Sequence, residues 1–198
     1  MRIAMWSGPR NLSTAMMYSF GARSDSYVVD EPFYAAYLAL REAGEAHGMK
    51  LFGALAVDSM RMEKGYLHWK AEILTEFDPF ETGLERFVDM GKPDFIGKDA
   101  LSARQKKDLQ KQLVTLRLES KIAAAHGGAS LMDQGRVVGT VTSGAFGHRT
   151  GLNIAYAFVE PSYASIGASI EIDVLGEMVP AQVVEKSLYD AENLLVRS

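Results

Sequence analysis

The sequence contains no cysteine among its 198 residues. A disulfide framework, a thiolate metal site and a cysteine nucleophile are therefore excluded. No apolar run approaches the roughly 18 residues of a membrane span, and the opening residues MRIAMW lack the apolar core and cleavage site of a signal peptide. The net charge is −4 and no basic block occurs, which disfavours nucleic acid as a partner. We expect a cytoplasmic protein with neither a membrane nor a nucleic-acid partner.

Several motifs of common enzyme classes are also missing. The Walker A pattern GxxxxGK[ST], the zinc pattern HExxH and the nucleophile elbow GxSxG do not occur. His47 and His126 have no partner at metal-ligand spacing, so no metal site is predicted. Ser7 and Ser143 lie outside any elbow motif, which gives a serine hydrolase little support.

The composition is that of a folded globular chain, with 47% hydrophobic and 23% charged residues. From residue 112 onward, apolar and polar residues alternate in short runs separated by Gly, Pro and Asp, which is typical of a small antiparallel barrel or sandwich. The predicted strands are Gln112–Glu119, Arg136–Ser143, Leu152–Val159, Ala168–Leu175 and Met178–Glu185. We therefore predict an α+β protein with a C-terminal antiparallel β-barrel over about residues 112–186.

Helices and loops are expected before the barrel. The spacing of apolar residues predicts a helix over Tyr34–Met49, and a polar helix is predicted over Leu101–Lys111. Asp94 and Asp99 are interpreted as loop and N-capping residues of that second helix.

The N-terminal stretch has the order of a phosphate-binding unit. Apolar Arg2–Trp6 precedes the turn Ser7–Ser13 and the apolar run Thr14–Phe20, which predicts a β-α-β fragment of P-loop type with Ser26–Asp30 as its second strand. Backbone N–H groups at such a turn suit phosphate or sulfate; the alternative is a turn that only caps a helix. The candidate anion-binding residues are Ser7, Gly8, Arg10, Ser13 and Thr14.

Two family resemblances divide the chain. The N-terminal sequence MWSGPRNLSTAMMYSF…VVDEPFYAAYL, within about residues 1–38, resembles the start of bacterial sulfotransferase-like proteins. The blocks SMRMEKGYLHW, DFIGKDAL and GTVTSGAFGHRTG resemble the glycine-cleavage T-protein (aminomethyltransferase) family, in family order from about residue 40. Within that family, they resemble the folate-binding part of dimethylglycine and sarcosine dehydrogenases. The two resemblances together predict a chimera whose parts join near residues 37–41. The expected domains are residues 1–38, 39–111 and 112–198.

The second resemblance implies transfer of a one-carbon unit from an amine to tetrahydrofolate. It implies folate and a small methylamine-derived substrate as ligands. It also implies that the family's catalytic N-terminal part is missing, so no catalytic residue is assigned, and that part is a candidate partner in another chain. The sequence contains no FAD-binding motif. Two alternatives remain open: a sulfotransferase-like binder of a phosphosulfate donor nucleotide, and a non-catalytic barrel domain that needs a partner chain.

Four residues of the part that resembles the T-protein family are candidates for a folate pocket. Arg61 matches the family arginine near the folate tail and is suited to bind a carboxylate, although a salt bridge with Glu63 or a neighbouring acid is the alternative. Trp69 is expected either to stack on folate or to pack in the core. Glu63 and His148 are further pocket candidates, with a turn or surface position as the alternative for His148.

Overall fold

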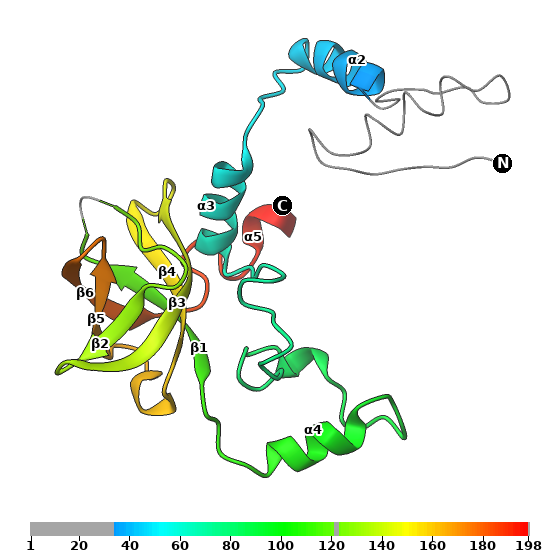
Figure 1. The fold of residues 1–198 in the computed structure, drawn as a ribbon. Coiled ribbons are helices and arrows are strands. Elements are labelled where there is room, and N and C mark those ends of the chain that lie inside the picture. Colours follow the sequence, from blue (N-terminus) through cyan, green and yellow to red (C-terminus); the bar gives the residue numbers. More distant parts are fainter. Residues whose placement is uncertain (1–33, 121–122, 198) are drawn as a thin grey trace, which may run out of the picture. The chain divides into compact units, whose positions relative to one another are not determined.

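The computed structural model describes residues 34–120 and 123–197 (Figure 1). The chain divides into two compact units, residues 1–51 and residues 52–198. The N-terminal β-α-β fragment predicted for residues 2–30 lies outside the described residues. In the described part of the chain, no helix is long and apolar enough to cross a membrane.

A closed six-stranded antiparallel barrel forms the body of the second unit, with the strand order β1-β4-β3-β2-β5-β6. The predicted barrel is thereby confirmed. Its strands are β1 Gln112–Leu118, β2 Ser130–Asp133, β3 Arg136–Gly147, β4 Leu152–Val159, β5 Ser169–Val174 and β6 Glu177–Val184. The five predicted strands all exist, whereas β2 was not predicted.

The helices are short and differ from the predicted ranges. They are α2 Tyr34–Glu45, α3 Ala54–Lys64, α4 Lys98–Gln105 and α5 Leu194–Arg197, with 3-10 turns η1 Glu85–Phe87 and η2 Pro161–Tyr163. Helix α4 begins three residues before its predicted start and ends six residues before its predicted end. Gly97 occupies its N-cap, so Asp99 lies in the first turn and the N-capping interpretation of Asp99 is wrong. An acid in the first turn still complements the helix dipole.

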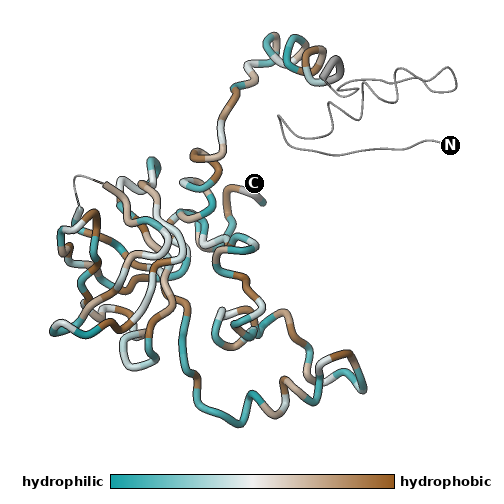
Figure 2. The backbone as a smooth tube through the Cα atoms, in the orientation of Figure 1, coloured by the Kyte–Doolittle hydropathy of each residue, from teal (hydrophilic) through white to brown (hydrophobic). Residues whose placement is uncertain are grey.

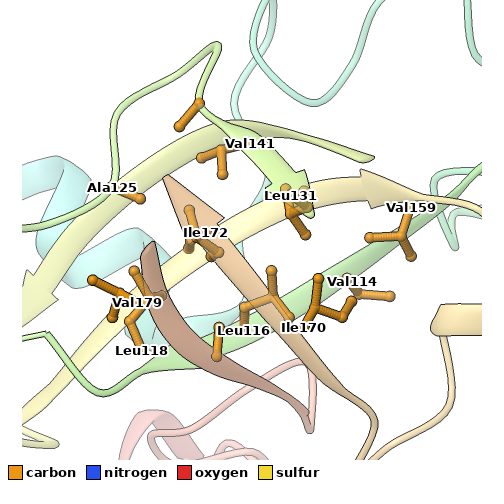
Figure 3. Close-up of a cluster of buried hydrophobic side chains, with 14 of the residues drawn as sticks. Val114, Leu116, Leu118, Ala125, Leu131, Val141, Val159, Ile170, Ile172 and Val179 are labelled. Carbon is orange, nitrogen blue, oxygen red and sulfur yellow. The ribbon is translucent and has the colours of Figure 1, made fainter. Parts of the chain in front are cut away.

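The barrel interior is filled by aliphatic side chains from all six strands (Figure 3). Leu116, Leu131 and Ile172 are fully buried there. Hydrophobic stretches recur along the barrel strands, whereas the segment that joins α4 to β1 is hydrophilic (Figure 2). Among the residues that the structure describes, the barrel therefore has a continuous apolar core of its own.

Strand β4 is buried on both faces. Ala155, Ala157 and Val159 point into the barrel core, while the alternate residues Ile154 and Tyr156 join a second cluster with Met62 of α3. Because successive side chains of a strand point to opposite faces, α3 must cover the outer face of β4. This packing brings α3 and the loop that follows it onto β3 and β4.

Candidate functional site

Glu72 is the centre of a polar network beneath α3. Its side chain has no exposed area, yet it carries a carboxylate. Oε1 accepts hydrogen bonds from the hydroxyls of Thr142 (2.9 Å) and Ser143, and Oε2 accepts from the backbone N–H of His68 (2.7 Å) and from Arg61 (3.2 Å). A buried charge is tolerated only when it is paired and hydrogen-bonded, and here both oxygens have two donors each. We call this set the Glu72 network.

Arg61 supplies the positive charge of the network. Its Nε donates to Asp58 Oδ1 at 2.7 Å, Nη1 donates to Glu72 Oε2, and Nη2 donates to Ser143 Oγ at 2.9 Å. The guanidinium carbon also lies 5.9 Å from the centroid of the Tyr156 ring. The side chain is 11% exposed. Its ion-pair partners in the described part of the chain are Asp58 and Glu72 rather than Glu63.

The end of α3 fixes the orientation of Arg61. Gly65 ends the helix in the left-handed region (φ 77°), and a β-carbon there would lie 2.7 Å from the carbonyl oxygen of Lys186. Glycine is the residue that fits both conditions. The Tyr156 hydroxyl donates to the carbonyl oxygen of Met62 at 2.7 Å, which ties the last turn of α3 to β4. Burial of that hydroxyl raises the pKa of Tyr156 far above its ordinary value.

Glu63 lies at the turn between β3 and β4. It is 1% exposed, and its Oε1 accepts from the backbone N–H groups of Arg149 and Thr150 at 2.8 Å each, as well as from the Thr150 hydroxyl. Glu63 therefore holds the turn between β3 and β4 against α3. The structure places it beside that turn and not beside Arg61.

Trp69 and His148 lie at the surface. Trp69 is 62% exposed, so it is not a core residue, and its ring is free on a large part of its surface. His148 is exposed in the β3–β4 turn, with its ring edge-on to Phe146 at a centroid distance of 5.2 Å. The structure brings Arg61 close to Glu72 and Ser143, but it does not place His148 in that network. The predicted anion-binding residues between Ser7 and Thr14 lie outside the described residues.

A cleft of about 490 Å³ adjoins the network. Thr142, which binds Glu72, also forms part of its wall, and Lys70, the residue after Trp69, lines it. Lys111 and the ring of Phe77, which stacks on Phe158 at 3.6 Å, lie along the same cleft. The cleft thus combines two cationic side chains and the carboxylate of Glu76 with an aromatic wall.

Sequence reasoning missed Glu72, Thr142 and Ser143. Glu72 is one acid among many in the sequence, and nothing in its spacing reveals that it becomes buried. Thr142 and Ser143 lie inside the block GTVTSGAFGHRTG. That block indicated the family, but no motif in it indicated that these two hydroxyls bind a buried carboxylate.

Comparison with known proteins defines the class of the barrel. Residues 111–190 match the model of the glycine cleavage T-protein C-terminal barrel domain, and residues 1–63 match a sulfotransferase domain model. The crystal structure of aminomethyltransferase T of the glycine cleavage system from Bartonella henselae aligns with a TM-score of 0.71 at 23% identity, over 78% of this chain and 44% of that one. The fold is thus that of a T-protein C-terminal barrel.

The relatives over this part of the chain are dimethylglycine dehydrogenases and aminomethyltransferases. Human mitochondrial dimethylglycine dehydrogenase is 35% identical over 163 residues, which are 82% of this chain and 19% of that protein. The aminomethyltransferase of Saccharopolyspora erythraea is 36% identical over 156 residues, which are 78% of this chain and 42% of that protein. The chain therefore spans about a fifth of the first relative and less than half of the second. The predicted double resemblance is confirmed, and the sulfotransferase match extends to residue 63, beyond the junction predicted near residues 37–41.

Proposed function

We propose that this chain is a folate-binding, aminomethyltransferase-type module of a one-carbon enzyme similar to dimethylglycine or sarcosine dehydrogenase. Tetrahydrofolate is the proposed ligand, and a small methylamine-derived molecule is the proposed substrate of the complete enzyme. The names of three relatives support this proposal, since dimethylglycine, an aminomethyl group and 4-methylaminobutanoate each carry a one-carbon group next to nitrogen. We also propose the division into segments 1–38, 39–111 and 112–198.

The Glu72 network beside an exposed aromatic ring and a cleft is the observation that carries the proposal. A folate offers a flat ring system, an aromatic linker and carboxylates. Trp69 presents a ring for stacking, and Lys70 and Lys111 present cations for carboxylates. Arg61 is proposed to act at the same site, where its contacts with Glu72 and Ser143 hold it in one orientation. Glu63 and His148 are proposed as further residues of the pocket.

We propose that catalysis requires groups beyond the described residues. In this proposal the reactive acid belongs to the part of the family that this chain does not span, and the described residues contribute positioning and ring-binding groups. We therefore propose ligand binding as the property of this chain. Transfer of the one-carbon unit is proposed only for an assembly that also contains the remaining part of the enzyme.

A second candidate function rests on the match of residues 1–63 to a sulfotransferase domain. It predicts binding of a phosphosulfate donor nucleotide through Ser7, Gly8, Arg10, Ser13 and Thr14. A non-catalytic barrel domain that needs a partner chain is the third candidate, favoured by the short span of this chain relative to its relatives.

The first experiment is a calorimetric titration of the full chain with tetrahydrofolate, repeated for variants of Trp69. Loss of a stacking ring removes about 1 kcal/mol, so Trp69→Ala is expected to raise Kd about fivefold, whereas Trp69→Phe retains most of the affinity. Leu175→Ala serves as the matched control, because Leu175 is 74% exposed and lies in the β5–β6 turn. Equal Kd values for all variants would show that Trp69 does not contact folate.

The second experiment measures the role of Arg61. Arg61→Ala is expected to weaken folate binding, and its fold is checked by circular dichroism because it leaves Glu72 without its cation. A folded Arg61→Ala variant with unchanged folate affinity contradicts the assignment of Arg61 to the site.

A further inference from the structure

The turn at residues 68–73 is closed by the carboxylate of Glu72. The carbonyl oxygen of His68 accepts hydrogen bonds from the backbone N–H groups of residues 71, 72 and 73 at 3.1–3.3 Å, and the N–H of His68 donates to Glu72 Oε2 at 2.7 Å. The N–H of Lys70 donates to the carbonyl oxygen of Ile73 at 3.1 Å. Because Glu72 is itself buried and bound to two hydroxyls of β3, the backbone of this turn is held in one conformation.

Lys70 has a backbone conformation in this turn that favours glycine. Its φ is 71°, in the left-handed region, where a β-carbon crowds the following carbonyl oxygen. Asparagine and aspartate relieve this cost through local hydrogen bonds, but lysine has no short polar group that does so. Strain of this kind is a reason to look for a use of the side chain that is kept there.

The side chain of Lys70 lies in a cationic cleft. Lys70 and Lys111 line the cleft beside the Glu72 network, and neither forms an ion pair with a carboxylate of the described residues. The pKa of Glu160 is lowered first by its hydrogen bond to Arg136 and also by Lys111, but Glu160 pairs with Arg136 at 2.7 Å. Glu76 adds one negative charge to the lining, so the three charged side chains of the cleft sum to +1. The cleft therefore favours an anion.

The aromatic wall of the cleft is Phe77. Its ring stacks on that of Phe158, with the ring centroids 3.6 Å apart and the ring planes 15° from parallel. Phe158 is buried, whereas Phe77 is only half-buried and lines the cleft. A flat ring that enters the cleft meets Phe77, and aromatic pairs attract each other beyond the area that they bury. Two cations beside one accessible ring match the chemistry of an aromatic carboxylate.

We propose that the cleft binds an aromatic carboxylate and that Lys70 selects for the carboxylate. The choice of ligand rests on the proposed function, because the p-aminobenzoylglutamate half of folate has a benzoyl ring next to carboxylates. In this arrangement the ring lies against Phe77, and the carboxylates accept charge-assisted hydrogen bonds from Lys70 and Lys111. Lysine is kept at position 70 for this contact, although glycine suits the backbone better.

The test is a calorimetric titration of the full chain with p-aminobenzoylglutamate, which lacks the pterin ring. We expect saturable binding to the native chain and at least threefold weaker binding to Lys70→Gly, whereas Lys70→Arg keeps the cation and most of the affinity. Leu175→Gly is the matched control, because Leu175 has the same left-handed conformation (φ 56°) in the β5–β6 turn, and it should leave Kd unchanged. Thermal denaturation is expected to give Lys70→Gly a melting temperature no lower than that of the native chain.

Selection for the carboxylate is tested with p-aminobenzamide, which has the ring without a carboxylate. We expect it to bind the native chain at least threefold more weakly than p-aminobenzoylglutamate does. The proposal is wrong if the native chain does not bind p-aminobenzoylglutamate or if Lys70→Gly binds it as tightly as the native chain does. Equal affinity for p-aminobenzamide and p-aminobenzoylglutamate also overturns it.

Titration with tetrahydrofolate separates this result from the proposed function. Tetrahydrofolate that binds equally well to the native chain and to Lys70→Gly, without any binding of p-aminobenzoylglutamate, contradicts the role of the cleft and leaves folate as the ligand. Binding of p-aminobenzoylglutamate through Lys70 without binding of tetrahydrofolate does the reverse.

Discussion

Arg61 and Glu72 form the most deeply placed ion pair of the second unit described here, and each stabilises the other in a site with little water. Removal of one partner of a buried pair leaves an unpaired charge, which costs about 3–5 kcal/mol. We expect Arg61→Met to lower the free energy of unfolding by this amount, as measured by urea denaturation.

The double variant Arg61→Met/Glu72→Met is the control for that interpretation. It removes both charges, so its loss of stability should be clearly smaller than the sum of the losses of the two single variants. Strict additivity of the two substitutions contradicts direct coupling between Arg61 and Glu72.

Because the Tyr156 hydroxyl is buried, we expect the protein to lose stability at alkaline pH. Burial raises its pKa in the folded protein above the value of about 10 for an unfolded chain. Between these two values the folded state binds more protons, so the free energy of unfolding falls as pH rises above about 10. Urea denaturation between pH 8 and pH 11 should show this decline, and Tyr156→Phe should reduce it. The same steepness in both proteins would assign the decline to other groups.

At the scale of elements, β3 depends on a close approach of two backbones. A β-carbon at Gly144 would lie 1.9 Å from the carbonyl oxygen of Ala125. We expect Gly144→Ala to destabilise the protein by about 1–3 kcal/mol, because either β3 or the backbone around Ala125 has to shift. Gly53→Ala is the control, since a β-carbon at Gly53 meets nothing within 4 Å. Thermal denaturation of both variants measures the difference, and equal melting temperatures contradict the predicted clash.

Strands such as β5 and β6 could be predicted from sequence because their residues alternate between core and surface. Strand β2 escaped prediction because four residues, Ser130–Asp133, are too few to show a period. Helix α3 escaped because its buried face contains Ser59 and Glu63 beside Met62, so burial does not follow hydrophobicity there. Polar residues that are buried through specific hydrogen bonds leave no periodic signal in the sequence.

The candidate site was only half visible from the sequence. Arg61 and Trp69 could be chosen through family resemblance, whereas Glu72 and Ser143 became evident only when the loop after α3 was seen against β3. The structure shows that Arg61 pairs with Asp58 and Glu72, and its contact with folate stays a prediction. A contact between residues 71 positions apart depends on strand register, which composition and spacing do not reveal.

For the whole molecule, the central claim is that the part of the chain from α3 onward determines its ligand. The most direct measurement is a pair of calorimetric titrations of the full chain, one with tetrahydrofolate and one with adenosine 3',5'-bisphosphate. The account predicts saturable heat with tetrahydrofolate that Trp69→Ala weakens, and none with the nucleotide. Saturable binding of the nucleotide without binding of tetrahydrofolate would contradict the account and would favour the sulfotransferase-like alternative.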